Sequence, residues 1–133
     1  MRQKPALTYT DVQKMMAACK AEAQKNKWNV TIAIVDDSGA ALLLERMDGA
    51  GPISAEVAMG KARTSAATKR PTKFWEDRVK EKPAFVTFPS GGVLFQGGLP
   101  VMYQGECVGA IGVSGVQSHE DEQVAQAGVS ALG

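Results

Sequence analysis

Glycine is concentrated in one part of this chain: eight of the fourteen glycines fall within residues 91–115. The same region holds short apolar segments that predict β-strands at residues 84–88, 99–103 and 106–114, the last two joined by a tight turn. Glycine weakens a strand interior and is typical of places where a helix, a subunit or a ligand comes close to the backbone. We therefore expect another element to cross these strands at short range.

A helix with a narrow inner face is the predicted neighbour of those strands. Ser54 is its candidate N-cap residue, and Pro71 ends it, after which Thr72 is predicted to cap a short further helix. The inner face carries only small side chains: Ala58, Ala62, Ser65 and Ala66. Such a face would let the helix lie close to the sheet that it covers.

The remaining elements complete a layered α+β domain. Thr10 opens a capping-box pattern for a first helix, whose apolar stripe would bury Cys19. Residues 29–35 and 40–47 predict a β-hairpin around a polar turn, and Ser118 has capping-box spacing for the last helix. Strands joined by short turns pair antiparallel, and helices must cover their apolar faces. We therefore predict an antiparallel sheet flanked by helices.

Composition limits the function classes. The 133 residues, 44% hydrophobic and 22% charged, predict one domain over residues 1–133, because domains typically hold about 100–150 residues. No apolar run approaches the roughly 18 residues of a membrane span, and the first residues lack the apolar region of a secretory signal. We therefore expect a cytoplasmic protein with no membrane partner. Two cysteines and one histidine are too few for a disulfide framework or a protein-only metal site.

Charge is balanced overall but unevenly distributed. A net charge of +1 and a pI near 7.7 argue against nucleic acid as a partner, since duplex binding neutralises many phosphates. All 15 lysines and arginines lie in residues 1–82, beside ten acids, whereas residues 83–133 hold four acids and no base. These charges could solvate helix faces, bind an anionic ligand or join complementary subunit surfaces. We favour the first explanation for most of them.

Two basic segments are candidate ligand contacts. Arg46, Met47 and Asp48 end a predicted strand, where a guanidinium could bind a carboxylate or phosphate with two hydrogen bonds; the alternative is an ion pair between Arg46 and Asp48 at the surface. Lys61 and Thr64 lie on the small-faced helix. A buried lysine can act as a base or Schiff-base nucleophile, although most lysines on such a helix are exposed.

Three positions in the last strand region, Gly112, Ser114 and Gly115, could line a gap open to a ligand. The segment lacks the spacing of a phosphate-binding loop and of a serine nucleophile motif. Residues that could contact or ligate a haem are Met47, Met59, Met102, Tyr103 and Cys107. Core packing is the alternative for these five.

The start of the last helix carries three further candidates. His119 is the only imidazole and could exchange protons or ligate a cofactor metal; solvent exposure is the alternative. Glu120 and Asp121 form a close acid pair that could move protons, but their position also suits the positive end of a helix dipole. We place the capping role ahead of the catalytic one.

Four motifs carry a resemblance to a known family: Glu45-Arg46-Met47-Asp48-Gly49-Ala50, Lys61-Ala62-Arg63-Thr64-Ser65-Ala66, Gly97-Gly98-Leu99-Pro100-Val101 and the run from Gly105 to Gly115. Through these motifs the chain resembles the GlcG/HbpS-like family. This is the so-called haem-degrading domain, which is also similar to the C-terminal domain of PduO-type corrinoid adenosyltransferases.

The resemblance implies a sheet of about five strands and a homo-oligomer, dimer-based and often large. It also implies haem as a candidate cofactor, since some members bind haem. Its propionates would then seek Arg46, Lys61 or Arg63. The chain departs from the family where Val116-Gln117-Ser118 replaces the common Gly-Gly-Thr, and its first helix has no histidine to serve as axial ligand.

Three functional hypotheses follow. In the leading one, a cytoplasmic oligomer binds an anionic small molecule, with haem or another tetrapyrrole as the candidate, between the small-faced helix and the glycine-rich strands. In the second, the protein is an enzyme acting on a small carboxylate metabolite, in which either Lys61 or the pair of Glu120 and Asp121 moves protons while Arg46 orients the substrate carboxylate. In the third, it is a structural or scaffolding module. The ligand residues proposed for the first are Arg46, Met47, Asp48, Lys61, Thr64, Gly112, Ser114, Gly115 and His119.

Overall fold

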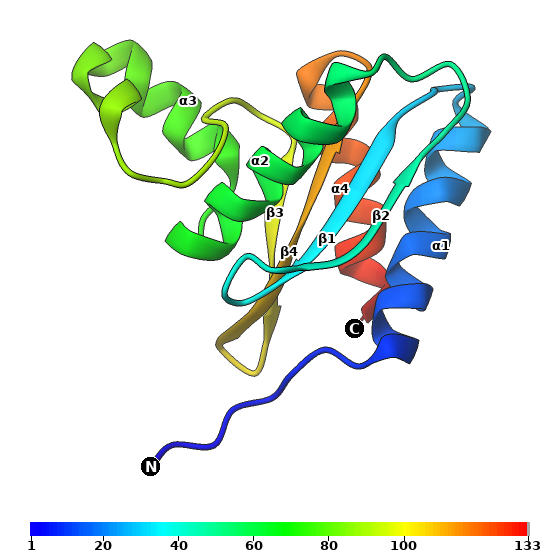
Figure 1. The fold of residues 1–133 in the computed structure, drawn as a ribbon, viewed down its shortest axis with the longest axis horizontal. Helices are drawn as coiled ribbons and strands as arrows, with labels where there is room; N and C mark the ends of the chain where they lie inside the picture. Colours follow the sequence, from blue (N-terminus) through cyan, green and yellow to red (C-terminus); the bar gives the residue numbers. More distant parts are fainter. Residues whose placement is uncertain (133) are drawn as a thin grey trace.

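A computed structural model describes residues 1–132. Its strands are β1 (Thr31–Asp36), β2 (Ala41–Arg46), β3 (Gly98–Tyr103) and β4 (Glu106–Ser114). They form one sheet in the order β2-β1-β4-β3, and every neighbouring pair is antiparallel (Figure 1). The predicted α+β class with an antiparallel sheet is confirmed. β2 and β3 are the edges, and Pro100 is tolerated in β3 because an edge strand has unpaired positions.

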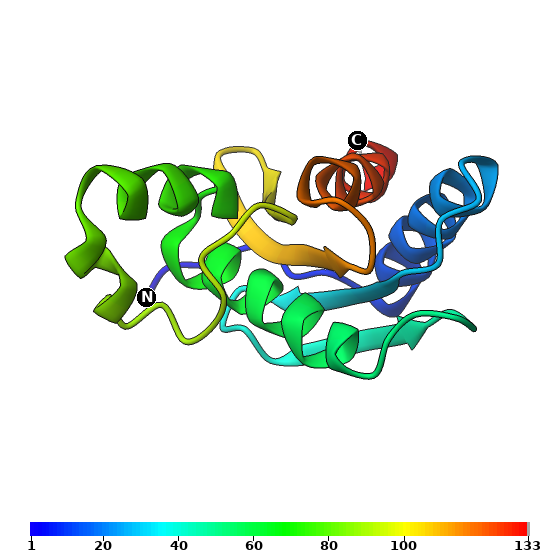
Figure 2. The same cartoon turned by 90° about the horizontal axis from the view of Figure 1, so that it is seen from above.

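Four α-helices and one short 3₁₀ helix surround this sheet. They are α1 (Tyr9–Lys25), α2 (Ile53–Thr68), α3 (Thr72–Glu81), η1 (Pro83–Thr87) and α4 (Ser118–Leu132). Figure 2 shows α1 and α4 together on one side of the sheet and α2 on the other. The α3–η1 region projects beyond the sheet (Figure 1). No helix within residues 1–132 is both long and apolar enough to cross a membrane.

The sheet has two unlike faces. Toward α1 and α4 it presents large side chains such as Ile32 and Ile111, which pack with Met15, Met16 and Cys19. Toward α2 it presents mainly small ones. Successive side chains on a strand point to opposite faces, so β1 supplies both cores. Cys19 is fully buried, as its place on the helical stripe predicts.

The close approach predicted from the glycines is present between α2 and β4. A Cβ atom at Gly112 would collide with the Ala58 carbonyl oxygen and lie 2.5 Å from the Ala62 nitrogen. Both are backbone atoms, which cannot rotate away. The glycine on the strand and the alanines on the helix therefore let α2 lie directly on the sheet.

The strand prediction for residues 84–88 is wrong, and the sheet has four strands rather than about five within residues 1–132. This segment forms most of η1 because its aromatic side chains pack on α3 and no strand is available beside it. The Phe88 ring stacks on Trp75 with centroids 4.6 Å apart, and Phe85 lies 5.9 Å from Trp75. Pro83 begins η1, where its missing N–H costs no hydrogen bond.

The first predicted N-cap is also wrong. α1 is capped by Thr8, whose Oγ1 accepts from the Asp11 amide while the Asp11 carboxylate accepts from the Thr8 amide. Thr10 lies inside the helix. Thr8 with Asp11 and Thr10 with Gln13 have the same three-residue spacing. The ionised Asp11 carboxylate accepts a stronger hydrogen bond than the neutral Gln13 side chain would, which favours the pattern that starts at Thr8.

Ser54 and Thr72 do not cap helices either. Each hydroxyl connects its helix to the sheet: Ser54 Oγ lies 2.7 Å from Thr31 Oγ1, and Thr72 Oγ1 accepts from the Gly98 amide at 2.9 Å. Both side chains are buried. Burial thus converts two expected caps into tertiary hydrogen bonds, which sequence spacing alone does not reveal.

Candidate functional site

A buried ion pair joins the small-faced helix to the start of α4. Lys61 Nζ donates to Asp121 Oδ2 at 3.0 Å and to the Val113 carbonyl at 2.9 Å. Asp121 Oδ1 in turn accepts from the Val116 amide at 3.1 Å. The two side chains are 1% and 3% exposed. Three elements, α2, β4 and α4, are therefore tied together at one ammonium group.

Burial dominates the electrostatics of this pair. It lowers the pKa of Lys61, while the charge of Asp121 opposes that shift. It also raises the pKa of Asp121, against the attraction of Lys61 and the hydrogen bond from Val116. The Phe95 ring lies 4.9 Å from Nζ, and a Cβ atom at Gly97 would come within 2.5 Å of it. The Lys61 amine is thus buried among Asp121, the Val113 carbonyl, Phe95 and Gly97.

The two neighbouring acids at the start of α4 have separate roles. Asp121 points inward to Lys61, whereas the Glu120 carboxylate accepts from the Gln117 amide at 3.2 Å and so caps the helix. The capping-box prediction for Ser118 and Asp121 is wrong, because the buried amine takes the Asp121 carboxylate. His119, between these acids and Ser118, is exposed.

Most of the predicted ligand residues near the glycine-rich region contact other parts of the protein and do not face open space. Gly112 lies beneath α2, and a Cβ atom at Gly115 would come within 2.5 Å of the Asn29 carbonyl oxygen. Ser114 is half-buried at the end of β4. Thr64 is buried, and its hydroxyl has no hydrogen-bond partner in the described chain. Since α2 rests directly on the sheet, the space expected between helix and strands is filled by protein.

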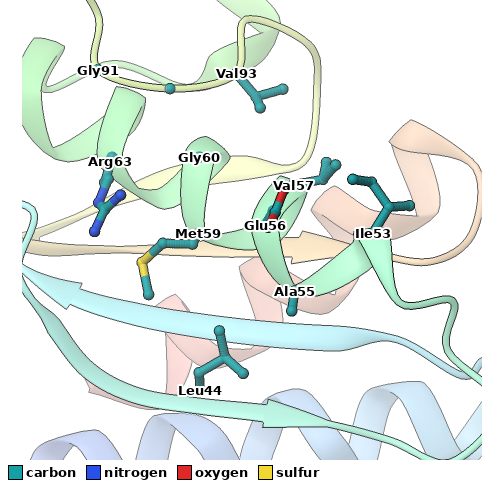
Figure 3. Close-up of a pocket in the computed structure, with 11 residues that line it drawn as sticks. Leu44, Ile53, Ala55, Glu56, Val57, Met59, Gly60, Arg63, Gly91 and Val93 are labelled. Atoms are coloured by element: carbon teal, nitrogen blue, oxygen red, sulfur yellow. The ribbon is translucent and has the colours of Figure 1, made fainter.

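An open groove lies instead along the outer side of α2. It has a volume of about 650 Å³, within the range of roughly 300–1,000 Å³ that ligand pockets occupy. Its floor is α2, one bank is β2 at Leu44, and the other is the loop before β3 (Figure 3). Eleven residues line it: Leu44, Ile53, Ala55, Glu56, Val57, Met59, Gly60, Arg63, Gly91, Gly92 and Val93.

Two side chains of α2 that the sequence predicts as haem contacts line this groove on the same side. Figure 3 shows Met59 and Arg63, one helical turn apart, both pointing toward the β2 bank that carries Leu44. Arg63 Nε also donates a long hydrogen bond, 3.4 Å, to the Gly39 carbonyl in the turn before β2. Most of the other lining residues are apolar, with Glu56 as the one further charged group among them.

The Arg46 segment stands at the far end of the same strand. Arg46 is exposed and shares the face of β2 that carries Leu44, because strand side chains alternate. Its Nε donates to the Ala50 carbonyl at 3.1 Å, so the ion pair with Asp48 is not the contact that orients it. Since Arg63 reaches the start of β2 and Arg46 ends it, the two arginines lie at opposite ends of this strand.

The groove residues on the loop before β3 were not among the candidates from sequence. Gly91, Gly92 and Val93 belong to no helix or strand, and their side chains carry no chemistry that a motif would reveal. Gly60 was the available signal, since a glycine in a helix interior usually has a packing or functional reason. Within residues 1–132, no cluster of three or more His, Cys, Asp or Glu side chains could hold a metal ion.

The fold is a small α+β domain with a helix-flanked antiparallel sheet and an open groove along α2, and comparison with known proteins identifies its family. Residues 7–130 match the family model described as "Haem degrading protein HbpS-like", and the chain belongs to this family. Protein GlcG of Escherichia coli strain K12 is 44% identical over 115 residues, which cover 86% of this chain and 85% of GlcG.

Two solved structures have the same fold. A doubly substituted HbpS of Streptomyces reticuli superposes with a TM-score of 0.91 at 36% identity, covering 100% of this chain and 91% of that one. A structure described as a PduOC:heme complex superposes with a TM-score of 0.88 at 29% identity, covering 96% and 95% of the two chains. The resemblance carried by the four motifs is confirmed.

Proposed function

We propose that this chain is a haem-binding protein that works as a cytoplasmic homo-oligomer, with the α2 groove as its ligand site. One observation carries the proposal: a thioether and a guanidinium, from Met59 and Arg63, project together into an otherwise largely apolar groove. Haem is an apolar ring with two carboxylates at one edge. The haem complex of the PduOC relative and the description of the family support this ligand.

The groove residues fit haem in three respects. Leu44, Val57 and Val93 offer apolar contact to the ring. Arg63 can bind a propionate, and a guanidinium does so with two hydrogen bonds. The Met59 thioether is an available axial donor. Bound haem would supply a redox-active iron and a strong visible absorption band.

Two of the ligand residues proposed from sequence keep a place in this proposal, although neither lines the groove. Arg46, on the same face of β2 as Leu44, can meet a second carboxylate beyond the groove. His119 is exposed and does not line the groove, so it would serve only from a neighbouring subunit. Met47, Asp48, Lys61, Thr64, Gly112, Ser114 and Gly115 stay predicted ligand residues, and none of them lines the groove.

The open shape of the groove supports assembly into dimers and larger oligomers. Leu42, Leu44 and Ile53 are 42%, 39% and 65% exposed along β2 and the start of α2. Ligand sites generally bury about 70–90% of the ligand surface, and one bank of this groove is low. A second copy packed on β2 would cover both these apolar side chains and the ligand.

The catalytic and scaffolding hypotheses have less support. Proton transfer requires an acid or base within hydrogen-bond reach of the substrate, whereas the Lys61 amine and the Asp121 carboxylate are bonded to each other beneath Phe95. Glu120 caps α4. The scaffolding hypothesis does not explain why Met59 and Arg63 line the same groove.

A haem titration followed at the Soret band tests the proposal. We expect saturable binding at one site per subunit or per dimer. Loss of a charged hydrogen bond costs about 1.5–3 kcal/mol, so Arg63→Ala should weaken binding at least about tenfold. Met59→Leu should shift the Soret maximum while keeping the volume of the side chain.

The matched control is Arg78→Ala, which changes an exposed arginine outside the groove and should bind haem as the unmodified protein does. Met102→Leu tests the exposed methionine that is also a predicted haem contact. The Arg46→Ala and His119→Ala variants measure the two outlying candidates. Diffuse association without a fixed stoichiometry, or unchanged binding by the Arg63 variant, would contradict the proposed site. Light scattering with and without haem reports the oligomer, and a monomer in both states would contradict the assembly.

A further inference from the structure

Residues 90–95 form a strap that runs across the outer side of α2 and provides one bank of the groove (Figure 3). The strap contacts the helix at two places: the Val93 amide donates to the Gly60 carbonyl at 3.2 Å, and the Phe95 ring lies 4.9 Å from Lys61 Nζ. Its own turn is held by Ser90, a buried residue whose Oγ accepts from the Gly92 amide at 3.2 Å. The strap is therefore a wall of the groove that is attached to the site helix at Gly60 and at Lys61.

The attachment at Gly60 requires glycine on both sides. A Cβ atom at Gly60 would lie 2.6 Å from Val93 Cγ2 and 3.2 Å from the Val93 nitrogen. A Cβ atom at Gly92 would collide with the Gly60 carbonyl oxygen. Glycine weakens a helix interior, so local helix stability does not explain its presence at position 60. Close contact with the strap does.

A second hollow adjoins the groove at the strap. That hollow, about 450 Å³ in volume, lies between the strap and α3, and its walls are mainly apolar. Gly92 and Val93 line both spaces. On the strap side of the groove, Gly91 and Gly92 present backbone without side chains, a surface against which a flat ligand can lie closely.

We propose that the strap is the specificity wall of the ligand site, positioned by Gly60 and closed by Val93. Gly60 fixes the distance between strap and helix, and thereby the width of the groove. Val93 stops the ligand from entering the second hollow. The ligand class that this wall selects is a flat macrocycle with anionic groups at its edge. This inference rests on the proposed haem function and adds the residues that set its selectivity.

A substitution and its compensating partner test the role of Gly60. Gly60→Ala should push the strap outward and weaken haem binding roughly tenfold, since overpacking at a fitted contact typically costs about that factor. Val93→Ala removes the Cγ2 atom that the new methyl group meets. The Gly60→Ala/Val93→Ala double variant should therefore bind haem no more weakly than Val93→Ala alone, which loses the apolar contact that Val93 gives the ligand. Gly51→Ala is the matched control, because a Cβ atom at Gly51 would have no neighbour within 4 Å.

Hydrogen exchange of the Val93 amide in the haem-free protein gives a readout that does not depend on the ligand. The amide should lose protection in Gly60→Ala and regain it in the double variant. Unchanged haem affinity in Gly60→Ala, or a double variant whose loss of affinity equals the losses of Gly60→Ala and Val93→Ala combined, overturns the strap inference while leaving haem binding intact. If the unmodified protein binds no haem, the proposed function and this inference both fall, whatever the exchange data show.

Discussion

The buried pair of Lys61 and Asp121 yields a prediction whose size can be worked out. At the observed separation of 3.0 Å, two unit charges attract by about 5–6 kcal/mol at an effective dielectric constant of about 20. Desolvation costs several kcal/mol for each ion, so the intact pair makes only a small net contribution. Removing one partner leaves the other charge buried, and this costs about 3–5 kcal/mol.

Two substitutions isolate that cost. Asp121→Asn retains an oxygen for the Val116 amide and removes only the charge, while Lys61→Met retains the aliphatic stem and removes the amine. Each should lower the free energy of unfolding by about 3–5 kcal/mol. The double variant should lose no more than either single one, because it contains no unpaired charge. The coupling energy should then be at least about 3 kcal/mol.

Urea unfolding followed by tryptophan fluorescence and circular dichroism measures these values. The exposed pair of Lys73 and Asp77, with atoms 2.7 Å apart, provides the control cycle. It should show a coupling of about 0–1 kcal/mol, as solvent-exposed pairs do. If both buried single variants stay within about 1 kcal/mol of the unmodified protein, the reasoning that the pair is desolvated and mutually dependent is refuted.

Three further predictions concern packing, pH and thiol chemistry. Gly112→Ala should lower the free energy of unfolding in urea by about 1–3 kcal/mol or more, because the added methyl group forces α2 away from β4. Gly51→Ala is the control and should change that free energy by less than about 0.5 kcal/mol. Equal effects of the two substitutions would contradict the packing argument. The Asp36 carboxylate accepts from the Ser38 hydroxyl and from the Ser38 and Ala40 amides, which hold its pKa below the ordinary value of 3.8. The ionised Asp36 carboxylate therefore stabilises the fold fully above its unfolded pKa, and this contribution is lost as the pH falls through the lower folded pKa. The stability difference between Asp36→Asn and the unmodified protein should thus vanish in acid. A difference that does not change with pH would contradict this. Burial raises the pKa of Cys19 to about 12, so at pH 8 Ellman's reagent should modify it only at the rate of unfolding. Because Cys107 is a second thiol, the labelled residue is located by peptide mapping, and rapid labelling at Cys19 would argue against that burial.

Sequence patterns predicted the fold where local and tertiary demands agree. The hairpin turn at Gln104 and Gly105 has positive φ at both residues, 49° and 79°, as a two-residue turn between twisted strands requires. The small inner face of α2 and Gly112 of β4 each predicted a close approach, and the structure brings them together. Residues 84–88 failed because an apolar segment of that length can pack on a helix as readily as pair with a strand.

Much less of the candidate site could be predicted. Lys61 and Asp121 are 60 positions apart in the chain, and no spacing rule relates them. The α2 groove depends on which side of the helix remains uncovered, a property of the assembled layers. Met59 and Arg63 are each predicted as possible haem contacts, but their shared groove requires α2, β2 and the strap to be placed together.

The strand order also governs when the chain can fold. The two central strands, β1 and β4, pair over residues 31–36 and 109–114, so the middle of the sheet closes a loop of more than 70 residues. Such distant pairing slows folding, because the entropy of loop closure is lost before the contacts form. During synthesis, α1, β1, β2 and α2 emerge before the strand on which α2 must rest. We therefore expect the first half of the chain to need protection from aggregation until β4 leaves the ribosome.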